Sequence, residues 1–222
     1  MSVLEPYNIS SIDFNNILFK FPKIIKSKKV IFLKYKKSNN FVVQLSKLTN
    51  HYISESNEIE FDVENNIIEF LNNLDNFIIN EAKKNSDNWF NHIDDKSSID
   101  YQRILNNNNT IKLKILDNEN FKTIVTLNDE EIYDFNNVSE NISGKVILEV
   151  YAVWIKNNSF GLLLRPIKIG LTDFQNKYNY NFLDSDSESD SNTLFIKNHT
   201  NTRNETTTST AESNDLNKLI LG

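Results

Sequence analysis

Alternating apolar and polar residues predict β-strands through much of the first 175 residues. Residues 28–37 mix β-branched and aromatic residues with lysines, and residues 41–47 place an apolar residue at every second position. The short polar turn between these two stretches predicts that 28–47 folds as a hairpin. Further strands are predicted at 58–63, 110–116 and 121–127.

The strongest strand signal lies in residues 145–156 and 159–171, which are rich in Val, Ile and Leu. Asn157 and Asn158 separate the two stretches, so we predict a second hairpin. Pro166 cannot donate a backbone hydrogen bond, and it therefore predicts an edge or a bulge in the returning strand.

A helical period replaces the strand period in residues 66–84. The apolar positions that recur at helical spacing are Ile67, Leu71, Leu74, Ile78 and Ala82. The predicted opposite, solvated face carries Asp75, Glu81, Lys83 and Lys84. Trp89 and Phe90 follow the helix, and we expect them to pack in the core.

These elements predict a mainly β fold with one inserted α-helix, arranged as a small barrel or sandwich. We divide the chain into an N-terminal extension at 1–19, one β-rich domain at 20–175 and a tail at 176–222. The tail contains an acidic serine run at 184–190 followed by Thr-, Ser- and Asn-rich sequence, which predicts disorder.

The residue types needed for most catalytic sites are missing or scattered. The chain has no cysteine, only three histidines, and four glycines that form no phosphate-binding loop. We therefore expect a protein that is not an enzyme and holds no metal or cofactor. The sequence has no signal-peptide pattern and no membrane-spanning apolar run, so an intracellular location is expected.

The formal net charge of −6 hides a segregation of charge along the chain. Residues 1–50 carry about nine lysines and two acidic residues, whereas 51–140 have a net charge of about −12 and 141–180 of about +3. Two basic segments far apart in sequence predict a polyanion-binding face. Lysines that only keep strand faces soluble are the alternative, and charge alone leaves both open.

Aromatic residues interleaved with lysines mark the candidate interface. Single-stranded nucleic acid is held by cations that contact phosphates and by aromatic faces on which bases stack. The alternative for each aromatic residue is a place in the core, with the lysines keeping strand edges soluble. The predicted nucleic-acid-binding residues are Phe32, Lys34, Tyr35, Lys36, Lys112, Lys114, Trp154, Lys156, Arg165 and Lys168.

A family resemblance is carried by short stretches along the domain, namely Val42-Val-Gln-Leu45, Leu74-Asp75, Asn88-Trp-Phe90, Gly144-Lys-Val-Ile147, Val153-Trp154, Phe160-Gly161 and Ile167-Lys-Ile169. With the acidic C-terminal region, this pattern resembles the OB-fold single-stranded-DNA-binding proteins of large eukaryotic DNA viruses. Those proteins are distantly similar to the single-stranded-DNA-binding protein of short-tailed coliphages.

The resemblance implies an OB-fold-like, five-stranded barrel over residues 20–172, with insertions. It also implies sequence-independent binding of single-stranded DNA in viral replication, recombination or repair. In the phage relatives the acidic tail contacts replication proteins and competes with DNA. This chain departs from them, because its acidic run lies about thirty residues before an apolar terminus.

The expected partners are single-stranded DNA, with RNA left open, and replication proteins that bind the acidic tail. Self-association is also left open, and no membrane is expected. The expected location is a cytoplasmic viral factory or the nucleus, with packaging in the virion as a further option. The alternative function is a structural or interaction protein, such as a virion component, whose tail docks a partner.

Overall fold

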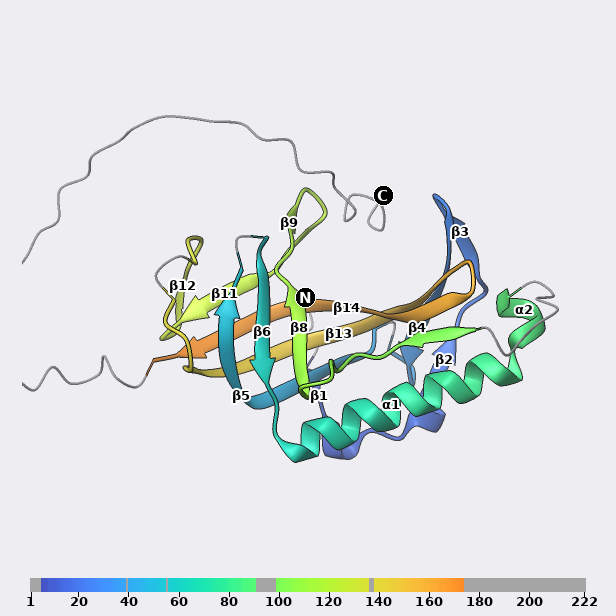
Figure 1. The fold of residues 1–222 in the computed structure, drawn as a ribbon, viewed down its shortest axis with the longest axis horizontal. Helices are drawn as coiled ribbons and strands as arrows, with labels where there is room; N and C mark the ends of the chain where they lie inside the picture. Colours follow the sequence, from blue (N-terminus) through green and yellow to red (C-terminus); the bar gives the residue numbers. More distant parts are fainter. Residues whose placement is uncertain (1–4, 39, 55, 91–98, 136–137, 174–222) are drawn as a thin grey trace, which may run out of the picture.

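The computed structural model describes residues 5–38, 40–54, 56–90, 99–135 and 138–173. This part of the chain is mainly β with one long helix, which confirms the predicted class at that level (Figure 1). The predicted acidic tail lies outside the described residues.

The strands before the long helix are β1 (Tyr7–Asn8), β2 (Ile17–Phe19), β3 (Lys23–Ile25), β4 (Lys28–Tyr35), β5 (Val42–Ile53) and β6 (Glu58–Asp62). The helices are α1 (Asn65–Lys84), α2 (Ser86–Phe90) and two 3-10 turns, η1 (Ile9–Ser11) and η2 (Phe14–Asn16). The later strands are β7 (Asp100–Gln102), β8 (Thr110–Lys114), β9 (Asp117–Asn118), β10 (Phe121–Lys122), β11 (Ile124–Leu127), β12 (Glu130–Glu131), β13 (Ser143–Lys156) and β14 (Ser159–Thr172).

The predicted C-terminal hairpin is confirmed and organises the fold. Strands β13 and β14 each have 14 residues and pair along their whole length. Pro166 sits at a bulge, as predicted, because Leu148 pairs with Pro166 while the preceding Ile147 pairs with Lys168. Among the described strands the main hydrogen-bonded order is β12-β11-β14-β13-β5-β6-β8, and it does not close on itself. Strands β6 and β8 cross in front of β13 and β14 in Figure 1.

The predicted hairpin at 28–47 is wrong, although both of its strands form. Strands β4 and β5 pair with the same edge of β13, one after the other, with Phe32 opposite Ala152 and Val43 opposite Leu148. The rings of Tyr35 and Phe41 stack at 5.1 Å where the chain passes from one strand to the next. A 14-residue partner is long enough to accept both strands, so they continue along it and do not fold back on each other.

The N-terminal residues that we assigned to an extension take part in the sheet where they are described. Strand β1 pairs with β5, and β2 pairs with β4. The ring of Phe14, in η2, stacks on Phe70 of α1 at 5.8 Å. Residues 7–19 therefore connect the sheet to the helix.

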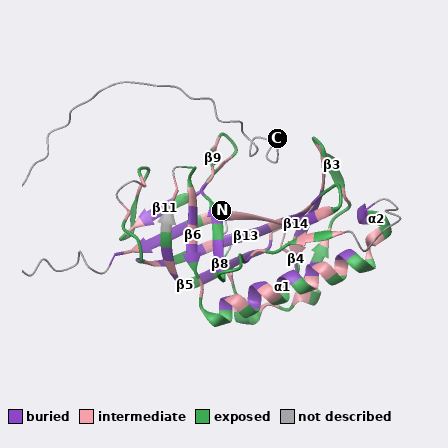
Figure 2. Cartoon of the chain, viewed as in Figure 1, coloured by how far each residue is buried: buried purple, intermediate pink, exposed green. Residues whose placement is uncertain are grey.

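Helix α1 confirms the helix predicted at 66–84, and its buried residues follow one side in Figure 2. All five predicted apolar positions are buried, and so are Trp89 and Phe90 at the end of α2. The prediction for Asp75 is wrong, because this residue is 0% exposed. A carboxylate is buried at this position because polar partners from β7 and the residues after it surround it.

Candidate nucleic-acid interface

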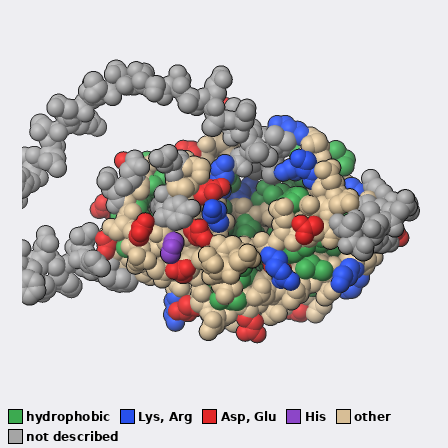
Figure 3. Space-filling model, in the orientation of Figure 1, with side chains coloured by type: hydrophobic (Ala, Val, Ile, Leu, Met, Phe, Trp, Pro, Cys, Tyr) green, Lys and Arg blue, Asp and Glu red, His purple; other side chains and the backbone are tan. Residues whose placement is uncertain are grey.

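A hollow of about 300 Å³ lies between β8 on one side and β7, β13 and β14 on the other. Its lining combines apolar side chains with cations, and Figure 3 shows hydrophobic side chains at a hollow that Lys and Arg side chains flank. Three residues predicted from the sequence meet here, namely Lys112, Lys114 and Trp154. The lining also includes Arg103 and the three leucines of 162–164.

Trp154 is the half-buried aromatic residue of this hollow. It stands opposite Gly161 on β14, and a Cβ atom on Gly161 would lie only 3.0 Å from the indole Nε1. The indole therefore lies against the backbone of β14, and a Cβ atom at position 161 would crowd it. The Nζ atom of Lys28 lies 5.7 Å from the ring centroid, within the range of a cation–π contact.

Strand β8 places Lys112 and Lys114 at the hollow through strict alternation. Ile111 and Leu113 point into the core, so the two lysines point to solvent. The Nζ of Lys112 lies 3.8 Å from the carboxylate of Glu58. An exposed ion pair of this kind is worth less than about 1 kcal/mol, so it leaves Lys112 able to contact a phosphate.

Arg103, which our sequence analysis missed, is held at the hollow by a buried carboxylate. Its Nη1 lies 3.9 Å from Asp75 Oδ2. Asp75 also accepts hydrogen bonds from the hydroxyl of Tyr101 at 2.6 Å and from the backbone N–H of Ile104 at 3.2 Å. Burial raises the pKa of Asp75, and these three contacts oppose that rise. Burial and the neighbouring carboxylate also raise the pKa of Tyr101.

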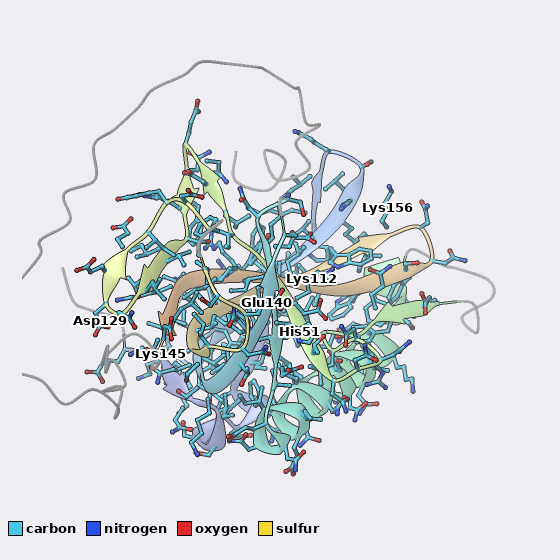
Figure 4. All side chains as sticks on the ribbon, turned by 60° about the vertical axis from the view of Figure 1, so that its left-hand side comes forward. His51, Lys112, Asp129, Glu140, Lys145 and Lys156 are labelled. Atoms are coloured by element: carbon cyan, nitrogen blue, oxygen red, sulfur yellow. The ribbon has the colours of Figure 1, made fainter. Side chains whose placement is uncertain are left out.

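The face of Trp154 continues onto β4 and the tip of the β13–β14 hairpin. Val30 stands opposite Trp154 and Phe32 opposite Ala152, so Phe32 lies on the same face and is half-buried. Lys34 shares this face and is half-buried opposite Leu18. Lys156 is exposed at the end of β13, and Figure 4 shows it toward the right-hand edge of the view, with Lys112 near the middle.

Tyr35 does not belong to this surface, contrary to our prediction. Its side chain is 0% exposed, packs against Tyr7 and Phe41, and its hydroxyl accepts a hydrogen bond from the backbone N–H of Asp13. The ring is buried in the core, so no base can stack on it. Lys36 is exposed in the turn after β4, where its Nζ lies 5.6 Å from the Tyr7 ring centroid and 5.2 Å from that of Tyr35.

Arg165 and Lys168 also lie away from the hollow. Arg165 forms an ion pair with the buried Glu149, and its guanidinium lies 4.4 Å from the Phe121 ring centroid. Lys168 stands opposite Ile147, seven residues along β13 from Trp154. At about 3.3 Å per residue, this separation is roughly 23 Å. The predicted cations therefore form two groups, one at the hollow and one farther along β13 and β14.

No signal in the sequence singled out Arg103, because it follows a three-residue strand too short to show a period. Lys28 was part of a predicted strand, but its place beside Trp154 depends on the pairing of β4 with β13. No group of three or more His, Asp or Glu side chains able to hold a metal ion occurs among the residues that the structure describes. None of the described helices is long and apolar enough to cross a bilayer.

The chain is thus a mainly β protein with an apolar hollow bordered by cations. Residues 47–184 match the model of a family of unknown function (DUF5871), and the chain belongs to this family. The matched segment starts within β5, so it includes Trp154, Lys112 and Arg103, whereas β1 to β4 precede it. No curated protein matches the chain.

Proposed function

We propose that this protein binds single-stranded DNA without sequence preference, as a non-catalytic factor in viral DNA replication, recombination or repair. One observation carries the proposal: a half-buried Trp154 lies in a hollow lined by Lys112, Lys114 and Arg103, and the Nζ of Lys28 lies 5.7 Å from the centroid of its ring. Aromatic faces that stack on bases, next to cations that follow the phosphates, are the two requirements for such binding.

The geometry favours a single strand over a duplex. A base can stack on Trp154 only if its own face is free, and in a duplex both faces of each base are covered by neighbouring base pairs. The leucines of 162–164 extend the apolar floor beside the indole. Cations beside this floor would hold the backbone next to a stacked base. Base stacking and phosphate contacts carry no sequence information, which supports binding without sequence preference.

We also propose that the fold is related to the OB-fold, which is a five-stranded and partly open barrel. Strands β5, β6 and β8 curve away from β13 and β14, and β8 returns close to β14. The helix α1 lies between β6 and β8 in the sequence. In this proposal the hollow is the opening of the barrel between β8 and β14.

The acidic stretch 176–222 is our proposed contact for replication proteins. Its support is its composition alone, because it lies outside the described residues. A role in replication would place the protein in a cytoplasmic viral factory or in the nucleus.

The direct test is a titration of the full chain with oligothymidine. Trp89→Phe leaves Trp154 as the only tryptophan, and its fluorescence should be quenched when a base stacks on it. The logarithm of the binding constant should fall with the logarithm of salt concentration by about 0.7 per phosphate contacted.

Competition with duplex DNA and with RNA of the same length should then rank single-stranded DNA first. Preference for RNA would change the proposed ligand. Absence of binding at low salt would contradict the proposal and favour a structural or interaction protein.

A further inference from the structure

A second cleft, of about 650 Å³, lies beside the β3–β4 hairpin. The connection between β2 and β3 forms one wall, and the residues at the end of α1 and in α2 form the other. Its lining includes Phe21, Lys20, Lys23, Asn85 and Asn88. The cleft therefore combines an aromatic ring, two cations and two side-chain amides.

Phe21 is the most exposed large apolar residue of the described chain, at 91%. Its neighbour Phe19 packs edge-on against Trp89 at 5.3 Å and so anchors the segment to α2. The packing of Phe19 therefore fixes this connection in place, but no packing contact in the described chain accounts for the exposed ring of Phe21. An aromatic ring presented to solvent between Lys20 and Lys23 has the composition of a base-stacking position.

Lys29 of β4 ties the β3–β4 hairpin to the wall of the cleft that α2 forms. Its Nζ donates hydrogen bonds to the backbone carbonyls of Asn88 at 3.2 Å and Trp89 at 2.7 Å. Burial lowers the pKa of Lys29, which indicates that part of its hydration is lost in this contact. The hairpin is thus held against α2, and the cleft exists before any ligand arrives.

The cleft and the hollow are close neighbours along the sheet. Lys23 pairs with Val30, and Val30 pairs with Trp154. Two strand spacings separate the backbones of Lys23 and Trp154, which is about 10 Å. Strand β3 pairs only with β4 among the described strands, so it is an edge that a nucleic acid strand can pass around.

We propose that this cleft is a second nucleotide-binding position for the same single strand of DNA, an inference that rests on the proposed function. A base stacks on Phe21, and Lys20 and Lys23 contact the flanking phosphates. The strand runs from Trp154 past Lys28 and Lys23 and around the edge of β3. The binding site is then longer than the hollow alone.

The test compares oligothymidines of about 4 and about 16 nucleotides by fluorescence anisotropy with the full chain. Phe21→Ala removes the stacking ring. Tyr133→Ala is the matched control, because Tyr133 is also an exposed aromatic residue, at 69%, and lies outside the lining of both the cleft and the hollow.

Phe21→Ala should weaken binding of the longer oligonucleotide about 5- to 140-fold, as expected for the loss of one stacked base. Its affinity for the shorter one should not change, and Tyr133→Ala should change neither. Lys20→Gln should lower the salt slope for the longer oligonucleotide by about 0.7.

If Phe21→Ala binds the longer oligonucleotide as the wild type does, the second position is wrong and the proposed function stands. If the wild type binds neither oligonucleotide, both proposals are wrong.

Discussion

The buried carboxylate of Asp75 accepts a 2.6 Å hydrogen bond from the hydroxyl of Tyr101, and this bond joins α1 to β7. The same carboxylate lies 3.9 Å from Arg103 at the hollow. A surface cation of the candidate interface is therefore positioned by a group inside the core. This arrangement lets the core be tested separately from the surface.

Tyr101→Phe should destabilise the protein because it leaves a buried carboxylate without one of its donors. Loss of one partner of a buried polar group costs about 1–3 kcal/mol. Chemical denaturation should show this decrease in the free energy of unfolding. Tyr133→Phe, at an exposed position, is the control and should have almost no effect.

Asp75→Asn should change how stability depends on pH. Burial raises the pKa of Asp75 above 3.8, so the folded state favours the protonated carboxyl. The contribution of Asp75 to stability is therefore greatest below the pKa of the unfolded chain and declines as the pH rises through the raised pKa. Denaturation of both proteins from acidic to neutral pH should show the wild type losing stability relative to the variant. A difference that does not vary with pH would contradict this prediction.

Trp154→Ala should weaken binding of oligothymidine about 5- to 140-fold, because a stacked base is worth about 1–3 kcal/mol. Trp154→Phe keeps an aromatic face and should retain most of the affinity. Both variants should fold, since the side chain is only half-buried. Circular dichroism checks folding, and equal affinities of the two variants would show that the ring does not stack.

Gly161→Ala should displace the indole of Trp154. The added Cβ would lie 3.0 Å from the indole Nε1 and 3.1 Å from the backbone oxygen of Gln102, which has little freedom to move. Overpacking of this kind costs about 1–3 kcal/mol. Gly170→Ala is the matched control, because the nearest neighbours of its Cβ would be side-chain atoms, namely Lys145 Cε at 3.0 Å, Lys145 Cγ at 3.3 Å and Thr126 Oγ1 at 3.6 Å. Trp154 emission and thermal unfolding should change in the first variant and not in the second.

The cations near the hollow should dominate the salt dependence of binding. Lys114→Gln and Lys28→Gln should each lower the salt slope by about 0.7, the value for one phosphate contact. Lys168→Gln removes the same charge roughly 23 Å from Trp154 and should leave the slope unchanged. Equal effects of all three substitutions would mean that net charge, and not the hollow, controls binding.

The sequence predicted the elements of this fold better than their pairing. Strict alternation in β8 and the long apolar runs of β13 and β14 are local signals, and all three strands form. The partner of β4 is not a local property, because it depends on β13 being long enough to accept two strands on one edge. The supposed hairpin at 28–47 failed for this reason.

The candidate site was predicted in part for a related reason. Strand β4 carries a large ring on each face, and alternation does not say which face turns inward. Tyr35 is buried in the core because its ring packs against Tyr7 and Phe41, whereas Phe32 on the other face is half-buried. We placed Lys168 and Trp154 in one site because both lie in the same predicted hairpin. The hairpin is long, however, and the two residues lie far apart along it.

The end-to-end placement of β4 and β5 has a consequence for assembly during synthesis. Strand β4 borders β13, which follows it by more than a hundred residues, so this pairing has a high contact order. At about 5–20 residues per second, a ribosome needs roughly 6–25 s to make the chain from Lys28 to Trp154. The neighbourhood of Lys28 and Trp154 is thus completed late, and a nascent chain cannot carry this surface until β13 has emerged.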